Sequence, residues 1–376
     1  MKRKPETSRR EFLAGGRPKG AKSRELNVEP VDSQKTLPET AEDRSAHYLE
    51  HFSKKAMACE FELFFNMRQY SNSGVAAMEA FQLIDELEEQ LSVYRKSSEI
   101  SQLNREANQE WVRIEEGFFE VLVRGIEISQ WTLGAFDMTS QPLSDIWGFT
   151  DRQGRVPGDT EILAALENVG YQGVRLNPEN HSVRLEPAGL QVNLGGIGKG
   201  YALDRAALKL ATDGIQDFVL HGGQSSVVAR GRETRHDSEQ ESGWTVGLSH
   251  PTIPDRRLAE IYLRDMALAT SGTGRQGFYF QGRRYGHIID PRTGYPSDHC
   301  LSSTVISTAA ADCDALATAF FVMRPEQVAE FCDEHPEFKV LMVVPANQPG
   351  GIEVKAYNMG PDDWKLLVPS TTRDMN

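Results

Sequence analysis

Helical and strand-like residue patterns occupy different parts of the chain, and their order limits the folds open to it. Ala77, Phe81, Ile84, Leu87 and Leu91 recur at helical spacing after Ser73, a residue that could cap the helix. Further helices are predicted over 118–133, 159–169, 199–213 and 312–323, and another from Pro325. Strands are predicted over 217–229, 244–249, 258–269, 301–307 and 339–344, with a polar hairpin-like excursion at 230–243. Helices early and strands late favour an α+β fold over regular βαβ alternation.

The sequence divides into a tail and a body. Residues 1–45 are rich in Lys, Arg, Glu, Ser and Pro, and this composition predicts a disordered polar tail. Residues 46–370 are expected to form one large domain with a mixed or antiparallel sheet core and flanking helices. Within the tail, "SRREFLAGG" looks like the twin-arginine part of an export signal, but the apolar stretch of such a signal does not follow. A cytoplasmic location is therefore slightly favoured, and an exported one stays open.

Charge and cysteine content exclude several classes of protein. A net charge of −13 argues against nucleic acid or an anionic membrane surface as the main partner, although a local basic pocket for one phosphorylated ligand is compatible with it. No apolar run approaches the ~18 residues that a membrane-spanning helix needs. The four cysteines have no zinc-like spacing, so we expect buried free thiols.

The stretch "NLGGIGKGYALD", residues 193–204, combines four glycines with Lys199 before a predicted helix. It does not match the dinucleotide fingerprint, because Tyr201 stands at the last glycine position. It does not match a P-loop either, because Gly200 follows the lysine. Glycines still allow backbone N–H groups to approach a phosphate, and the helix start adds partial positive charge. A tight strand-to-helix turn with a surface lysine is the alternative.

Three other stretches carry candidate site residues. Asp137 lies between apolar residues before a Pro-containing turn, where a capping role is the alternative. His287 and Asp290 flank two isoleucines, so a short strand would place them on opposite faces unless the following turn folds them back. Asp314 and Thr318 are four residues apart on a predicted helix that is apolar nearly all round. Such a buried carboxylate and hydroxyl suit Mg²⁺, and the alternative is an ordinary helix start with Asp312 as its cap.

Taken together, these stretches resemble the ApbE-like FAD:protein FMN transferases from about Met57 to Met323. The motifs occur in the family's order: "MACEFE", "LSVYRKSSEISQLN", "GAFDMTSQPLSDIWGF", "NLGGIGKGYALD", "ATSGTGRQGF", "HIIDPRTGYP" and "DALATAFF". Each motif is weak alone, but the ordered set is specific. The resemblance implies an α+β fold that binds FAD and Mg²⁺.

The resemblance also assigns roles to individual positions. Those matching the family's flavin-nucleotide contacts are Met57, Tyr94, Ala135, Phe136, Asp137, Asn193 and Lys199. Asp314 and Thr318 match metal ligands, with a backbone oxygen of the glycine loop, Gly196, as a further ligand. His287 matches a histidine near the pyrophosphate that takes part in transfer, and His287 or the metal-associated Asp314 is the candidate base.

The implied activity is Mg²⁺-dependent transfer of FMN from FAD to a Ser or Thr hydroxyl of a target protein, with release of AMP. Targets in the family carry a Ser/Thr-Gly-Ala-Ser/Thr motif in membrane redox subunits. FAD hydrolysis to FMN and AMP, and non-catalytic FAD binding, are the alternatives. The sequence departs from the family pattern at Asn193, where many members have Asp, and at Gln224, where Asn or Asp is common.

Overall fold

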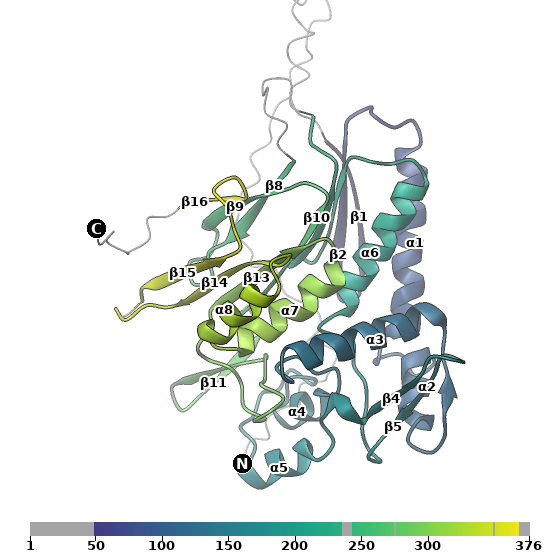
Figure 1. The fold of residues 1–376 in the computed structure, drawn as a ribbon, viewed down its shortest axis with the longest axis vertical. Coiled ribbons are helices and arrows are strands. Elements are labelled where there is room, and N and C mark those ends of the chain that lie inside the picture. Colours follow the sequence, from purple (N-terminus) through teal and green to yellow (C-terminus); the bar gives the residue numbers. More distant parts are fainter. Residues whose placement is uncertain (1–48, 235–242, 274–275, 349, 368–376) are drawn as a thin grey trace, which may run out of the picture. The chain divides into compact units, whose positions relative to one another are not determined.

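The computed structural model describes residues 49–234, 243–273, 276–348 and 350–367 (Figure 1). The predicted polar tail at 1–45 lies outside these residues, as does most of the excursion predicted at 230–243. Within the described body, the arrangement of helices and sheets is the α+β fold that the order of patterns predicts.

An antiparallel sheet of eight strands forms the centre of the body. Every neighbouring pair in it is antiparallel, which decides between the mixed and antiparallel alternatives. In spatial order the strands are β1 (Leu49–Ala56), β2 (Cys59–Asn66), β6 (Phe218–Gly222), β7 (Ser226–Arg230), β10 (Met266–Gly272), β13 (Ser302–Ser307), β14 (Lys339–Pro345) and β15 (Ile352–Tyr357).

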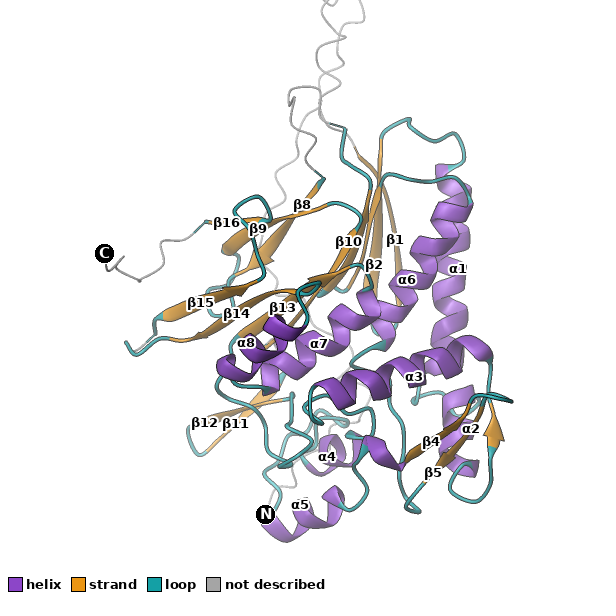
Figure 2. Cartoon of the chain, in the orientation of Figure 1, coloured by secondary structure: helices purple, strands orange, loops and turns teal. Residues whose placement is uncertain are grey.

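Both faces of this sheet are apolar over much of its width, because successive residues of a strand point to opposite faces. On β14, Val340 and Met342 join the core under the helices, whereas Leu341 and Val343 join a second core. The helical layer comprises α1 (Ser73–Leu91), α3 (Glu116–Trp131), α6 (Gly198–Thr212), α7 (Ala310–Val322) and α8 (Pro325–Glu334) (Figure 2). A three-stranded sheet covers the second core with β8 (Trp244–Ser249), β9 (Arg257–Leu263) and β16 (Trp364–Leu366).

Shorter elements surround the glycine-rich stretch. The helical ones are α2 (Glu99–Glu106), α4 (Gln141–Ile146), α5 (Asp159–Leu166) and the 3₁₀ turn η2 (Tyr171–Gly173). A small sheet consists of β3 (Val112–Arg113), β5 (Ser182–Leu185) and β4 (Val174–Asn177), and a separate hairpin of β11 (Gly277–Phe280) and β12 (Arg283–Gly286). This hairpin is anchored by Phe278 and Tyr285, which stack on each other and pack near Trp147.

Two of the predicted strands are each a pair of strands. The chain reverses at Gly223, where φ is 62°, so 217–229 contains β6 and β7. It turns again at Asp265, where φ is 54°, and passes from the three-stranded sheet to the central one, so 258–269 contains most of β9 and the start of β10. Periodicity alone does not reveal these turns, because both are short and apolar residues flank them closely.

The capping role predicted for Ser73 is wrong. Asn72 is the N-cap residue of α1, and no side chain caps that end. The Ser73 hydroxyl donates instead to the Glu50 carboxylate on β1, at 2.6 Å. A charged acceptor makes a stronger hydrogen bond than a neutral one, and this favours the contact with Glu50.

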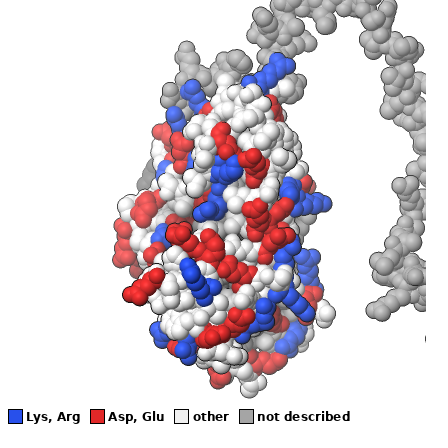
Figure 3. All heavy atoms as spheres, turned by 90° about the vertical axis from the view of Figure 1, so that its right-hand side faces the viewer, with Lys and Arg blue, Asp and Glu red and all other residues white. Residues whose placement is uncertain are grey.

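The face that carries α1 mixes acidic and basic side chains (Figure 3). Lys209 on α6 contacts both Glu79 on α1 and Asp213, while Lys54 pairs with Asp85. Exposed pairs of this kind add little stability, but they intersperse the two signs of charge across the surface. Among the described residues, no helix has both the length and the apolarity to cross a membrane.

All four cysteines lie within the described residues and are free thiols, as expected. Cys300, Cys313 and Cys332 are buried, whereas Cys59 is only partly so. Burial raises the pKa of Cys300 and of Cys332 to about 12, so both stay protonated at neutral pH. Because the thiolate is the reactive form, these two side chains serve packing rather than chemistry.

Helices α6 and α7 approach each other closely, and a glycine makes this possible. Every residue of α7 except Thr318 is buried, as its nearly uniform apolar composition predicts. A Cβ atom at Gly200 of α6 would lie 2.1 Å from the carbonyl oxygen of Ala310, at the start of α7. Only glycine therefore fits at this crossing.

Substitution of Gly200 tests this contact. Gly200→Ala should lower the free energy of unfolding by about 1–3 kcal/mol, because backbone atoms must move to admit the methyl group. Gly198→Ala is the matched control in the same helix, since its Cβ would meet only Leu194 at an ordinary 3.5 Å. Chemical denaturation of both variants measures the difference. Equal stabilities would contradict the close approach of α6 and α7.

Candidate functional site

A cleft of about 1080 Å³ opens beside the glycine-rich stretch. Its walls come from segments far apart in sequence: the β1–β2 turn, the chain after α1, the loop at 148–154, residues 193–199 and the start of β11. Residues of three predicted site motifs, Met57, Tyr94 and Lys199, line it together. The fold therefore brings three residues that are far apart in the sequence to the wall of one cleft.

Asn193 organises the glycine loop. Its Oδ1 accepts a hydrogen bond from the Gly195 N–H at 2.8 Å, which is an Asx-type turn. Its amide nitrogen donates to the side-chain oxygen of Gln141, and the Gln141 amide in turn donates to Asp145 and Thr150. An aspartate at 193 could accept from Gly195 but could not donate to Gln141. The departure from the family pattern is thus accommodated by a matching amide.

Lys199 and Asp314 form the charged centre of the site. Lys199 stands in the first turn of α6, and its Nζ lies 2.9 Å from Oδ1 of Asp314 on α7. The Ser226 hydroxyl, from β7, contacts both groups at 3.2 Å. The Asp314 side chain is only 9% exposed and also accepts from the Gly200 N–H. A buried carboxylate is stable only with such partners, and here α6 supplies two of them.

Thr318, one turn beyond Asp314, extends this centre into a cluster of oxygens. Its hydroxyl lies 3.1 Å from the Ser271 hydroxyl at the end of β10. Gly196 is adjacent, since a Cβ atom there would lie 3.7 Å from the Thr318 oxygen. One carboxylate, two hydroxyls and a nearby backbone carbonyl fit a hard divalent cation that also takes ligand phosphates.

Many protein metal sites consist of several His, Cys, Asp or Glu side chains, and the cluster at Asp314 and Thr318 differs from them. Among the described residues, no group of three or more His, Cys, Asp or Glu side chains is placed to hold a metal ion. A cation at Asp314 and Thr318 would therefore depend on phosphate oxygens for the rest of its coordination. The suggestion that Asp312 caps α7 is wrong, because the helix begins at Ala310. The Asp312 carboxylate instead forms a bidentate ion pair with Arg124.

Met57 is held in the cleft wall by a strained turn. Met57 and Ala58 both have positive φ, 48° and 59°, between the paired residues Ala56 and Cys59. Such turns favour Asn and Gly, and other residues adopt them at a cost of ~1–2 kcal/mol. The Met57 N–H donates to the Glu88 carboxylate at 2.7 Å, which ties the turn to α1.

Tyr94 lies in the chain segment that follows α1. It is 76% exposed and lines the same cleft. An exposed ring at the mouth of a cleft is suited to stack on a planar ligand.

Ala135, Phe136 and Asp137 lie beneath the cleft rather than on its surface. All three are buried, and the Phe136 ring lies close to Gly196, 3.1 Å from where its Cβ would be. The Asp137 carboxylate accepts from the Thr139 N–H, the Thr139 hydroxyl and the Tyr171 N–H, at 2.7–2.8 Å. Burial raises its pKa even so. The same segment supports the glycine loop, because the Phe136 ring packs against Gly196 and the Met138 carbonyl accepts from the Asn193 N–H at 2.7 Å.

His287 follows β12 directly and is partly buried. Its Nδ1 lies 3.3 Å from the carbonyl oxygen of Gln276. A carbonyl only accepts, so Nδ1 carries the proton and Nε2 of the neutral ring is left basic. Burial, reinforced by the charge of Arg284, lowers the pKa of His287. Asp290 begins the following turn and bonds Arg292, so it does not join this site.

Gln224 and two serines complete the comparison with the sequence. Gln224 sits in the β6–β7 turn with φ of 63°, a conformation that Asn and Asp adopt more readily, so the family preference there is conformational. Ser226 and Ser271 were not assigned a role from the sequence. Ser226 ends the stretch "HGGQSS" and Ser271 lies in "ATSGTGRQGF". Only the folded sheet reveals that Ser226 contacts Asp314 and that Ser271 contacts Thr318.

Comparison with known proteins agrees with this arrangement. The model of the ApbE family matches residues 57–342. The chain belongs to the ApbE family. It is 31% identical to an FAD:protein FMN transferase of Vibrio cholerae over 290 residues, which cover 74% of this chain and 84% of that protein. An Escherichia coli FAD:protein FMN transferase is 29% identical over 253 residues, covering 66% and 70%.

Solved structures show the same ApbE fold. The flavin transferase ApbE of Vibrio cholerae superimposes with a TM-score of 0.71 at 28% identity, covering 82% of this chain and 97% of that one. The ApbE protein of Thermotoga maritima gives a TM-score of 0.71 at 29% identity, covering 81% and 96%. The family and fold predicted from the ordered motifs are therefore confirmed.

Removal of the Asp137 carboxylate tests its supporting role. Asp137→Ala should lower the free energy of unfolding by about 2–4 kcal/mol, because two buried N–H groups lose their acceptor. Asp145→Ala is the control, since that carboxylate accepts from Gln141 and Thr150 at the exposed surface. Thermal unfolding measures both. Wild-type stability in Asp137→Ala, with weakened FAD binding alone, would show direct ligand contact instead.

Proposed function

We propose that this protein transfers FMN from FAD to a Ser or Thr hydroxyl of a target protein and releases AMP. The observation that carries the proposal is the cleft at the glycine loop, where the lining residue Lys199 contacts Asp314 and Ser226. The hydroxyls of Ser271 and Thr318, which contact each other, lie one helical turn further along α7. The FAD:protein FMN transferases of Vibrio cholerae and Escherichia coli share its family.

The cleft is suited to an extended dinucleotide. Its volume of about 1080 Å³ lies at the upper end of ordinary ligand sites. Tyr94 would stack on one aromatic ring of FAD, and Met57 would pack against the nucleotide. The pyrophosphate would lie against the start of α6, where Lys199 and the partial positive charge of the helix N-terminus would attract it.

Asp314, Thr318 and a backbone oxygen of Gly196 are the residues that would hold Mg²⁺. Bound there, the cation would neutralise charge on the pyrophosphate and on the departing AMP. The Lys199 ammonium, now paired with Asp314, would then turn toward a phosphate oxygen. This exchange is local, because Lys199 already lines the cleft.

The transfer itself is a substitution at phosphorus. The hydroxyl oxygen of the acceptor bonds to the phosphorus on the FMN side, and the bond from that phosphorus to the bridging oxygen breaks. AMP leaves with that oxygen, and the hydroxyl proton passes to Nε2 of His287. The products are a phosphodiester-linked FMN, AMP and one proton, so the reaction balances without a further reactant.

The acceptor would be a polypeptide that carries a Ser/Thr-Gly-Ala-Ser/Thr motif, as in membrane redox subunits. FAD and a protein are the two substrates that the relatives' name requires.

Mass spectrometry of an acceptor domain tests the activity. After incubation with the purified protein, FAD and Mg²⁺, a domain containing Ser-Gly-Ala-Thr should gain the mass of one FMN residue, and chelation of Mg²⁺ should prevent this. Asp314→Ala should give no adduct while it keeps part of the FAD affinity, because Met57 and Tyr94 are unaltered. Free FMN and AMP without an adduct would indicate a hydrolase, and bound FAD without either product would indicate a binding protein.

The pH dependence of transfer tests the role of His287. The base must be neutral, and burial lowers its pKa below the ordinary 6.5, so activity should persist below that pH before it falls. His287→Ala should reduce kcat by about 10²–10⁴-fold and abolish this acid limb. Rates measured at saturating FAD over a pH series provide the check. A limb that survives in His287→Ala belongs to another group.

A further inference from the structure

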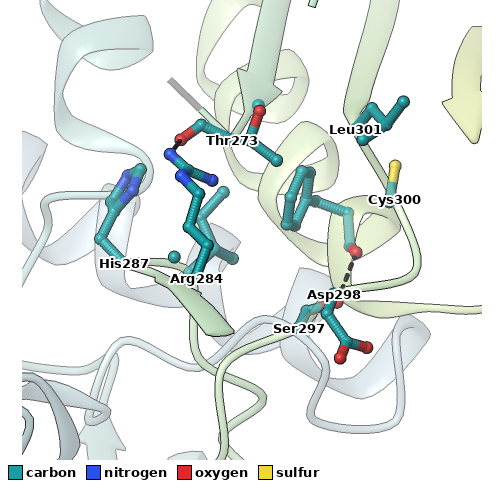
Figure 4. A pocket seen from close by; sticks show the side chains of 11 residues that line it. Thr273, Arg284, His287, Ser297, Asp298, Cys300 and Leu301 are labelled. Atoms are coloured by element: carbon teal, nitrogen blue, oxygen red, sulfur yellow. Dashed lines mark hydrogen bonds between the residues drawn. The ribbon is translucent and has the colours of Figure 1, made fainter. Parts of the chain in front are cut away.

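A second, smaller cavity of about 190 Å³ shares no lining residue with the large cleft. Figure 4 shows Arg284 and His287 on one side of it and Cys300 and Leu301 on the other. Its lining is mainly apolar, and polar groups of Ser297 and Asp298 lie at one end. Nothing in the cleft's proposed occupation by FAD uses this space.

The cavity is lined by His287 and by neighbours in sequence of Ser271 and Thr318. Gly272 and Thr273, which line it, follow Ser271, whose hydroxyl contacts Thr318. Phe321, which also lines it, is three residues beyond Thr318 and so lies on the same side of α7. His287 supplies the remaining contact. A group that enters the cavity therefore comes close to both the candidate cation site and the candidate base.

The start of the β11–β12 hairpin separates the two cavities. Gln276 lines the large cleft and His287 lines the small cavity, and the two are joined by the 3.3 Å contact of Nδ1 with the Gln276 carbonyl. In a substitution at phosphorus, the attacking and leaving oxygens lie roughly in line on opposite sides. An acceptor hydroxyl must therefore arrive from a different direction than the departing AMP, and this cavity provides one.

We propose that this cavity is the acceptor subsite, which receives a small side chain of the target polypeptide next to the Ser or Thr that takes up FMN. This inference rests on the proposed function. The volume of about 190 Å³ is small beside that of the cleft and suits one or two small side chains. The apolar floor suits an alkyl group, and the polar end suits the adjoining peptide backbone.

Gly286 provides the means to close the subsite without disturbing the fold. It lines the cavity, and a Cβ atom on it would meet no atom within 4 Å. Its φ lies outside the left-handed region, so larger residues are tolerated there. Gly286 is two residues from Arg284 on β12, so both point to the same face of the strand. Because Arg284 lines the cavity, a side chain at 286 would also point toward it.

The test is the series Gly286→Ala, Gly286→Val and Gly286→Leu, assayed at saturating FAD and Mg²⁺ against the Ser-Gly-Ala-Thr acceptor domain. The KM for the acceptor should rise with side-chain size, and kcat/KM for it should fall about tenfold or more in Gly286→Leu. The Kd for FAD should stay unchanged. Tyr279→Leu is the matched control, because it alters the partner strand β11 at a residue that lines neither cavity.

Each result separates the subsite from the transferase activity. An unchanged acceptor KM in Gly286→Leu, or a parallel loss of FAD affinity, overturns the proposal. Direct binding of the acceptor domain, with its hydroxyl residue replaced by Ala, is measured in addition by calorimetry. If wild type binds this domain and Gly286→Leu does not, the subsite stands even where no FMN is transferred. If wild type does not bind it, the subsite is rejected.

Discussion

The crossing of α6 and α7 is the contact on which the site depends. Gly200 leaves no side chain between the helices, so their backbones meet at Ala310. Four residues later, Asp204 accepts from the Ala310 and Ala311 N–H groups at 2.8 and 2.9 Å. Burial raises the pKa of Asp204 to about 6, so these two bonds offset only part of the cost of enclosing its charge. Together the two positions fix both the separation and the register of the helices.

That register brings Lys199 opposite Asp314, and the central sheet completes the arrangement. Ser226 stands at the start of β7 and Ser271 near the end of β10. These strand ends lie side by side, because neighbouring antiparallel strands run in opposite directions. Their hydroxyls reach Asp314 and Thr318 from the sheet side. Charge from the helices and hydroxyl oxygens from the strands thus meet at one point beside the cleft.

Local patterns were sufficient to predict the longer helices, because the apolar spacing of α1, α3, α6 and α7 depends on neighbours within the same turn or two, but the short helices α2 and α4 were missed. Short turns such as that at Asp265 depend on a single backbone conformation, so the strands on either side merged into one prediction. The family motifs named Lys199, Asp314, Thr318 and Met57, and the fold sets Lys199 against Asp314 and places Met57 and Lys199 along one cleft. They could not show that the Asp137 carboxylate is occupied by Tyr171 as well as by its neighbour Thr139, because a hydrogen-bond partner 34 residues away leaves no local pattern.

The hairpin of β11 and β12 bears on the choice between transfer and hydrolysis. Water needs no subsite of its own, since it reaches a phosphate through any gap left in the cleft. A polypeptide needs a surface on which to be held while its hydroxyl is aligned, and in the proposal β12 provides it through Arg284 and Gly286, which line the smaller cavity. Stacking of Phe278 on Tyr285, next to Trp147 and Phe149, anchors the hairpin to the body. In the proposed function, this firmly held wall, with His287 at its base, would keep the acceptor apart from FAD, and such an arrangement favours a protein acceptor over water.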